Sequence, residues 1–187
     1  MGFKKAATKR AAPVQLDEPK LLDYALKSLS VKAQTERELR TRLKRRAESA
    51  AVIDAVVAKL REYGYVDDAR FAEGYASARL ESRGHGKQRV MRDLRARSVD
   101  ANKAEKAVAK VFEGTDEVAL IEQYLARKFR GKVLPEYLAE PKNLAAAFRR
   151  LRYAGFSSAA SIQALRRHSE QADELEGTEE AEGTDSE

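Results

Sequence analysis

Three segments of the chain superpose without gaps when one leucine of each is aligned, and this repetition constrains the fold more than any other feature. The segments are ELRTRLKRRAESAAVIDAVVAKL (38–60), RVMRDLRARSVDANKAEKAVAKV (89–111) and AFRRLRYAGFSSAASIQALRRH (147–168), aligned on Leu43, Leu94 and Leu151. Apolar residues recur in them at three- and four-residue intervals, which is the period of an amphipathic helix. Offsets of 51 and then 57 residues are typical of a tandem helical unit.

Each copy has the features of a small helical unit. Six residues after the aligned leucine stands a good helix N-cap, fourteen after it an apolar residue, and upstream of it a tyrosine at a matching place. These residues are Ser49, Asp100 and Ser157; Val57, Val108 and Leu165; and Tyr24, Tyr75 and Tyr124. We therefore predict an all-α fold of three three-helix repeats, over 18–64, 65–114 and 115–168. The third repeat has an insertion near 131–141.

Charge is divided unevenly along the chain. The net charge is +6, but residues 169–187 hold nine acids and no base, and residues 20–168 hold 32 basic residues against 19 acidic ones. A body this basic attracts polyanions or an acidic protein surface. The two ends have little to bury, so we expect a disordered basic arm over 1–17 and a disordered acidic tail over 169–187.

Several classes of site and location are disfavoured by composition. With no Cys and two His residues, disulfides, thiol nucleophiles and Cys-based zinc sites are excluded, and we expect no metal or cofactor. No side chains form a nucleophile with its base, so we do not expect an enzyme. No apolar run approaches the roughly 18 residues that span a bilayer. We expect a cytoplasmic monomer that does not bind membranes.

The stretch YGYVDDARF (63–71) raises the question of an acidic site, because Asp67 and Asp68 are adjacent. Asp67 is a good N-cap, and Asp68 then lies in the first turn, where the helix dipole favours an acid. Val66 and Phe71 have the spacing of a hydrophobic staple. We therefore interpret Asp67, Asp68 and Phe71 as a structural motif that starts a helix.

Basic residues recur on the second helix of every unit. Directly after the aligned leucines come cations at equivalent positions, and other arginines surround them. The set is Arg42, Lys44, Arg45 and Arg46; Arg89, Arg92, Arg95 and Arg97; and Arg149, Arg150 and Arg152. A charged helix face is often only the solvated one. Recurrence in three units nevertheless predicts a basic stripe that binds a partner or DNA.

The motifs LREYGYVDDARFAEGY (60–75), GKQRVMRDLRARSV (86–99) and LRYAGFSSAASIQAL (151–165) resemble the RecX family, bacterial regulators of the recombinase RecA. The resemblance covers about residues 20–168. Ser98 and Ala47 stand where the family often has glycine. The resemblance implies an elongated, curved array of three three-helix repeats.

It also implies a non-enzymatic protein that binds RecA and the RecA–DNA filament, with direct DNA contact possible. Such a protein would inhibit filament growth, ATP hydrolysis, strand exchange and the co-protease activity of the SOS response. The alternative is a general basic nucleic-acid-binding helical protein that does not depend on RecA. A third possibility, a nuclease, needs clustered acids that helix caps do not provide.

Overall fold

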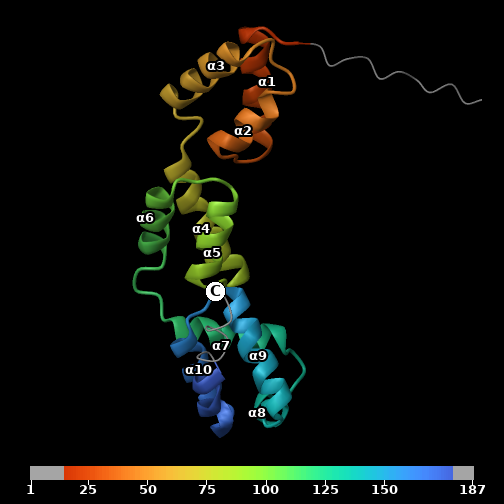
Figure 1. Ribbon diagram of the computed structural model, residues 1–187, viewed down its shortest axis with the longest axis vertical. Coiled ribbons are helices and arrows are strands. Elements are labelled where there is room, and N and C mark those ends of the chain that lie inside the picture. The colour runs from red at the N-terminus through yellow and green to blue at the C-terminus, as the bar shows by residue number, and fades with distance from the viewer. Residues whose placement is uncertain (1–14, 179–187) are drawn as a thin grey trace, which may run out of the picture. The chain divides into compact units, whose positions relative to one another are not determined.

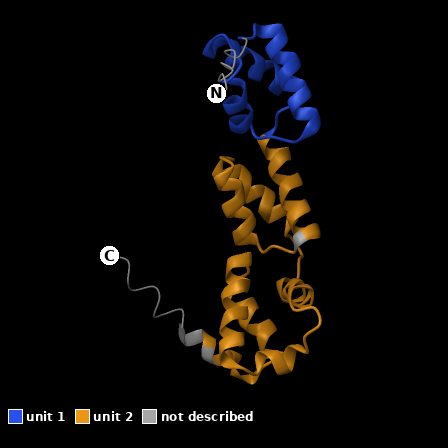
Figure 2. Ribbon diagram, turned by 90° about the vertical axis from the view of Figure 1, so that its right-hand side faces the viewer, with its two compact units in different colours: residues 1–67 blue, residues 68–187 orange. Residues whose placement is uncertain are grey.

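The computed structural model describes residues 15–178, and within that range it contains α-helices, one 3-10 helix and no β-strand. Its only extended pairing there is an isolated bridge between Leu16 and Ala47. The predicted all-α repeat is therefore confirmed. The chain divides into two compact units, residues 1–67 and 68–187, which are coloured separately in Figure 2. The elongated, curved array stays a prediction, as do the repeat boundaries.

The first unit is a three-helix bundle, α1 (Glu18–Val31), α2 (Glu36–Leu43) and α3 (Ala50–Glu62), which Figure 1 labels near the N-terminal end. Leu43 and Val57, two of the aligned positions, are fully buried in its core. A capping box at Thr35 and Glu38 starts α2, and Ser49 caps α3 by accepting a hydrogen bond from the Val52 amide. The backbone of Leu16 bonds to Arg46 and Glu48. The predicted disordered arm is therefore ordered at its end, and residues 1–14 lie outside the described residues.

The second unit begins with a bundle of α4 (Asp68–Arg83), α5 (Lys87–Ala96) and α6 (Ala101–Val111). Leu94 and Val108 pack in its core, and Asp100 caps α6 through the Lys103 amide. The predicted N-caps and core positions therefore recur in this bundle as well.

The rest of the second unit contains α7 (Glu117–Lys128), α9 (Pro141–Ala154), α10 (Ser158–Arg166) and a short α8 (Leu134–Leu138), which lies in the predicted insertion. Leu151 and Leu165 are fully buried in its core. Glu117 accepts hydrogen bonds from the amide and hydroxyl of Ser157, at 2.8 and 2.7 Å, so the first and last helices of this bundle are joined at a cap.

A 3-10 helix (Glu170–Thr178) follows α10 and corrects one expectation. Ala172 and Leu175 are buried against the core of the third bundle. The predicted acidic tail is therefore ordered as far as residue 178, because two apolar side chains give it something to bury. Residues 179–187 lie outside the described residues.

Ser98 has a left-handed backbone, with φ of 61°. It is the equivalent of Gly155, which ends α9 with φ of 92°. A side chain at such a position costs about 1–2 kcal/mol, and glycine removes that cost but adds freedom to the unfolded chain. We expect Ser98→Gly to raise the free energy of unfolding by about 1 kcal/mol. Urea denaturation followed by circular dichroism measures it, and a lowered stability would contradict the expectation.

Candidate cationic interface

The cations predicted in the first unit lie at the end of α2 and in the turn that follows it. Arg42, Lys44, Arg45 and Arg46 are all exposed. The guanidinium of Arg46 lies 5.7 Å from the centre of the Tyr24 ring. A backbone bridge between Leu16 and Ala47 holds the end of this turn in place. This part of the predicted set is therefore a solvent-facing cationic turn on an ordered backbone.

In the second unit the predicted cations of α5 differ in environment. Arg92 and Arg95 are exposed, whereas Arg89 and Arg97 are half-buried. Arg97 lies over the rings of Phe71 and Tyr75, at 4.9 and 5.2 Å from their centres. Guanidinium groups so placed are attracted by the ring and held against it. Phe71, predicted to start a helix, therefore also supports a cation.

A hydrogen-bonded chain fixes Arg89. The Tyr75 hydroxyl donates to one oxygen of Asp93 at 3.0 Å, and the Arg89 Nε donates to the other at 3.0 Å. The Asp93 side chain is only 23% exposed, so this carboxylate is largely shielded from water. The arginine is therefore held in one orientation before any partner binds.

The cations of α9 divide into exposed and structural ones. Arg149 and Arg150 are exposed, and Arg150 lies 5.8 Å from the centre of the Phe129 ring. Arg152 instead donates to the Phe156 carbonyl at 2.6 Å and is half-buried. We therefore assign Arg152 to the turn between α9 and α10 rather than to the contact surface.

The start of α5 lies against the end of α9. The Gly86 amide donates to the Ala154 carbonyl at 3.0 Å, and the Gln88 amide donates to the Gly155 carbonyl at 3.1 Å. Both glycines are needed, because a Cβ on Gly86 would lie 2.2 Å from the Gly155 oxygen and one on Gly155 would lie 2.2 Å from the Arg89 nitrogen. This close approach joins two bundles that are distant in sequence.

Tyr153 meets two of the predicted cations at this junction. The guanidinium carbons of Arg89 and Arg92 lie 4.8 and 5.9 Å from its ring centre, and an Arg92 nitrogen donates to the Tyr153 carbonyl at 2.9 Å. A hydrogen bond from Arg89, with its charge, lowers the pKa of the Tyr153 hydroxyl. We call Tyr153, Arg89 and Arg92 the Tyr153 platform.

Sequence reasoning missed the platform. Neither Tyr153 nor Asp93 is among the residues that the sequence predicts for the basic stripe. One local signal was available, since Arg89 and Asp93 are four residues apart on a helix and form an ion pair at 3.0 Å. The pairing of α5 with Tyr153 had no local signal.

The adjacent acids Asp67 and Asp68 do not belong to a metal site within the described residues. Asp68 is the first residue of α4, as expected of a helix start, and the described residues contain no group of three or more acids and histidines able to hold a metal. The capping role of Asp67 stays a prediction. None of the helices within residues 15–178 has the length and apolar character needed to cross a membrane.

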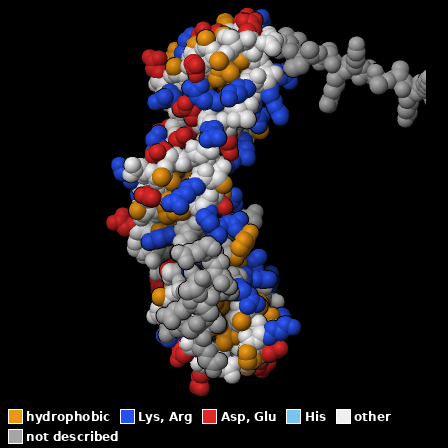
Figure 3. Space-filling view, viewed as in Figure 1, with side chains coloured by type: hydrophobic (Ala, Val, Ile, Leu, Met, Phe, Trp, Pro, Cys, Tyr) orange, Lys and Arg blue, Asp and Glu red, His pale blue; other side chains and the backbone are white. Residues whose placement is uncertain are grey.

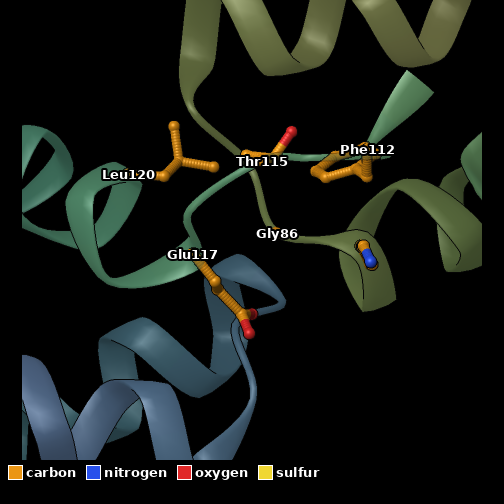
Figure 4. Close-up of a pocket in the computed structure, with 6 residues that line it drawn as sticks. Gly86, Phe112, Thr115, Glu117 and Leu120 are labelled. Atoms are coloured by element: carbon orange, nitrogen blue, oxygen red, sulfur yellow. The ribbon is translucent and has the colours of Figure 1, made fainter.

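A pocket lies beside the junction, and Gly86 is one of the residues that line it (Figure 4). It is lined by Gly86, Lys87, Phe112, Thr115, Glu117 and Leu120. The carboxylate of Glu117 is already used to bind Ser157. Glu117 is the acidic residue of this lining and its carboxylate binds the N-cap residue of α10, so we take the cationic surface as the candidate site.

Lys and Arg side chains are spread over the face of each unit that Figure 3 shows, with acidic side chains among them. Within the second unit, α5 and α9 bring their cations to one junction. A single stripe through all three repeats stays a prediction.

Comparison with known proteins gives consistent matches. The family model for "RecX, first three-helix domain" matches residues 22–68, and that for "RecX, second three-helix domain" matches residues 67–108. "Regulatory protein RecX" of Shigella sonnei is 30% identical over 131 residues, covering 65% of this chain and 76% of the relative.

Other relatives are matched over a smaller part. "Regulatory protein RecX" of Bacillus velezensis is 36% identical over 84 residues, and that of Deinococcus radiodurans is 38% identical over 88 residues. The matches span 45% and 47% of this chain, but only 32% and 41% of those relatives. The crystal structure of RecX from Lactobacillus salivarius has the same fold, with a TM-score of 0.64, 20% identity, and coverage of 81% of this chain and 96% of that one.

Proposed function

This chain belongs to the RecX family, and from that premise we propose that it regulates the recombinase RecA by binding RecA and its filament on single-stranded DNA. The regulatory name of its relatives and the match to two RecX domains carry the proposal. We further propose that binding inhibits filament growth, ATP hydrolysis, strand exchange and SOS co-protease activity. A non-enzymatic mode of action, a monomeric state and a cytoplasmic location stay predictions.

The structure supports binding by repeated weak contacts. Exposed cations lie at the end of α2, on α5 and on α9, so each bundle offers charge at an equivalent place. Repeated units that each contribute a modest contact gain affinity on a partner that is itself periodic. Charge attraction of this kind also raises the rate of encounter.

The test is the ATPase of RecA on single-stranded DNA. We expect the purified protein to lower the steady-state rate of ATP hydrolysis at less than one molecule per RecA, because capping or loosening a filament affects many subunits at once. A control without RecA checks that the protein does not hydrolyse ATP. An unchanged rate at a stoichiometric excess would contradict the proposal.

The alternative function, general nucleic-acid binding, is favoured by one observation, the exposed Tyr153 with two arginines beside its ring. Under this alternative we expect the protein to bind DNA tightly without RecA, with an affinity that falls steeply as the salt concentration rises. Under that alternative, adding RecA does not change the affinity of the protein for DNA. Any inhibition of the RecA ATPase is then proportional to the fraction of the DNA that the protein covers. Comparing inhibition with DNA occupancy distinguishes the two functions.

A further inference from the structure

We propose that the Tyr153 platform is a subsite for single-stranded DNA, in which an unpaired base stacks on the Tyr153 ring while Arg89 and Arg92 bind the flanking phosphates. The inference deepens the proposed function, since it rests on the DNA of the RecA filament as a partner. It assigns a role to an exposed aromatic side chain at the junction of α5 with α9.

The exposure of Tyr153 is the first observation. Tyr153 is 67% exposed, whereas the repeated tyrosine of the same bundle, Tyr124, is 6% exposed and packs in the core. Tyr153 keeps this exposure although the guanidinium carbons of Arg89 and Arg92 lie 4.8 and 5.9 Å from its ring centre. An open aromatic face is what a base requires for stacking.

The second observation is that the platform is preorganised. Arg92 is bound to the Tyr153 carbonyl, and Arg89 is held by Asp93, which in turn accepts from Tyr75. The backbone beneath is fixed by the contact of Gly86 with Gly155. Side chains that are already ordered lose less entropy on binding, so a small contact of this kind contributes more to affinity.

The third observation is the combination of groups. Arginine forks match phosphate oxygens, and a neighbouring ring stacks on any base, so together they bind single strands with little sequence preference. The carboxylate of Asp93 is already bonded to Tyr75 and Arg89 and does not present an uncompensated negative charge. In a duplex the faces of the bases are covered by their neighbours, which leaves no base for the ring.

The experiment separates bases from phosphates, in the absence of RecA. A labelled thymidine oligonucleotide of about 12 residues is compared by fluorescence anisotropy with one of equal length whose central positions are abasic. Both carry the same phosphates. We expect the full-length protein to bind the thymidine strand roughly 5- to 100-fold more tightly.

Variants then locate the stacking site. Tyr153→Ala is expected to remove the preference for the thymidine strand, because the ring on which the base stacks is lost, whereas Tyr153→Phe keeps the preference. Tyr63 is a matched control, because it is 64% exposed and no arginine among the described residues lies over its ring. Tyr63→Ala should bind both strands as the unaltered protein does.

Two results would overturn the inference. One is equal affinity of the unaltered protein for the two strands, and the other is a preference that survives in Tyr153→Ala. If Tyr153→Ala loses only RecA inhibition while strand binding is unchanged, Tyr153 contacts a protein, which refutes the subsite and leaves the proposed function standing. If Tyr153→Ala loses the strand preference but the unaltered protein does not inhibit RecA, the proposed function is refuted and the subsite stands.

Discussion

Replacing Gly155 with alanine is expected to lower the free energy of unfolding by about 2–5 kcal/mol. Gly155 has φ of 92°, which costs an alanine about 1–2 kcal/mol. The new Cβ would also lie 2.2 Å from the Arg89 nitrogen and 2.5 Å from the Arg89 Cβ, so the start of α5 must move. Overpacking against backbone adds about 1–3 kcal/mol. Urea denaturation followed by circular dichroism measures the loss.

Gly114→Ala is the matched control. Gly114 has φ of 68°, and nothing lies within 4 Å of the position that its Cβ would take. This variant should therefore lose only the conformational part, about 1–2 kcal/mol. Gly86→Ala tests the overpacking part of the loss. Gly86 has an ordinary φ of −74°, so an alanine there has only the steric clash with the Gly155 carbonyl. Equal losses in Gly155→Ala and Gly114→Ala would show that the junction of α5 with α9 is not a tight contact.

The repeated parts of the fold were predictable because their causes are local. Leu43, Leu94 and Leu151 are buried at equivalent places, since each lies on the apolar face of a short helix that packs on its own neighbours. At the caps, the side chains of Ser49 and Ser157 each accept a hydrogen bond from the backbone amide three residues further on. Such features need only a window of a few residues.

The junction between the bundles was not predictable in the same way. Arg92 and Tyr153 are 61 residues apart, and their contact depends on a glycine in each segment rather than on any repeated pattern. Sequence reasoning also took Arg152 as a surface cation. Its bond to the Phe156 carbonyl arises from the turn that Gly155 makes, and a charge pattern does not reveal which arginine closes a turn.

The candidate site contains two kinds of cation, those that are exposed and those that neighbouring side chains hold in place. Arg42, Lys44 and Arg45 are exposed on the first unit, so we expect them to contribute to binding through charge. Arg89 and Arg97 are held against rings, and Arg89 also against a carboxylate, so we expect their orientation to contribute to binding as well as their charge. Salt should therefore weaken the contribution of the first kind more than that of the second.

Reversing three exposed cations is expected to weaken binding to single-stranded DNA roughly 100-fold at about 0.1 M salt. The variant combines Lys44→Glu, Arg95→Glu and Arg149→Glu, one residue from each repeat. Arg152 is left intact because it bonds to the Phe156 carbonyl. Arg95 makes only an exposed ion pair with Glu105, at 3.7 Å, so its loss costs little stability. If each cation binds one phosphate, the slope of log affinity against log salt should fall by about two.

A matched control changes the same total charge elsewhere. Lys27→Glu, Lys103→Glu and Lys106→Glu reverses one exposed cation in the first unit and two in the second, on α1 and α6. If the predicted cations form the contact, the control variant keeps most of the affinity and nearly the full salt slope, and both variants keep the helicity of the unaltered protein by circular dichroism. Equal weakening in the two variants would instead mean that the overall charge of the body, and not the cations that recur after the aligned leucines, attracts DNA.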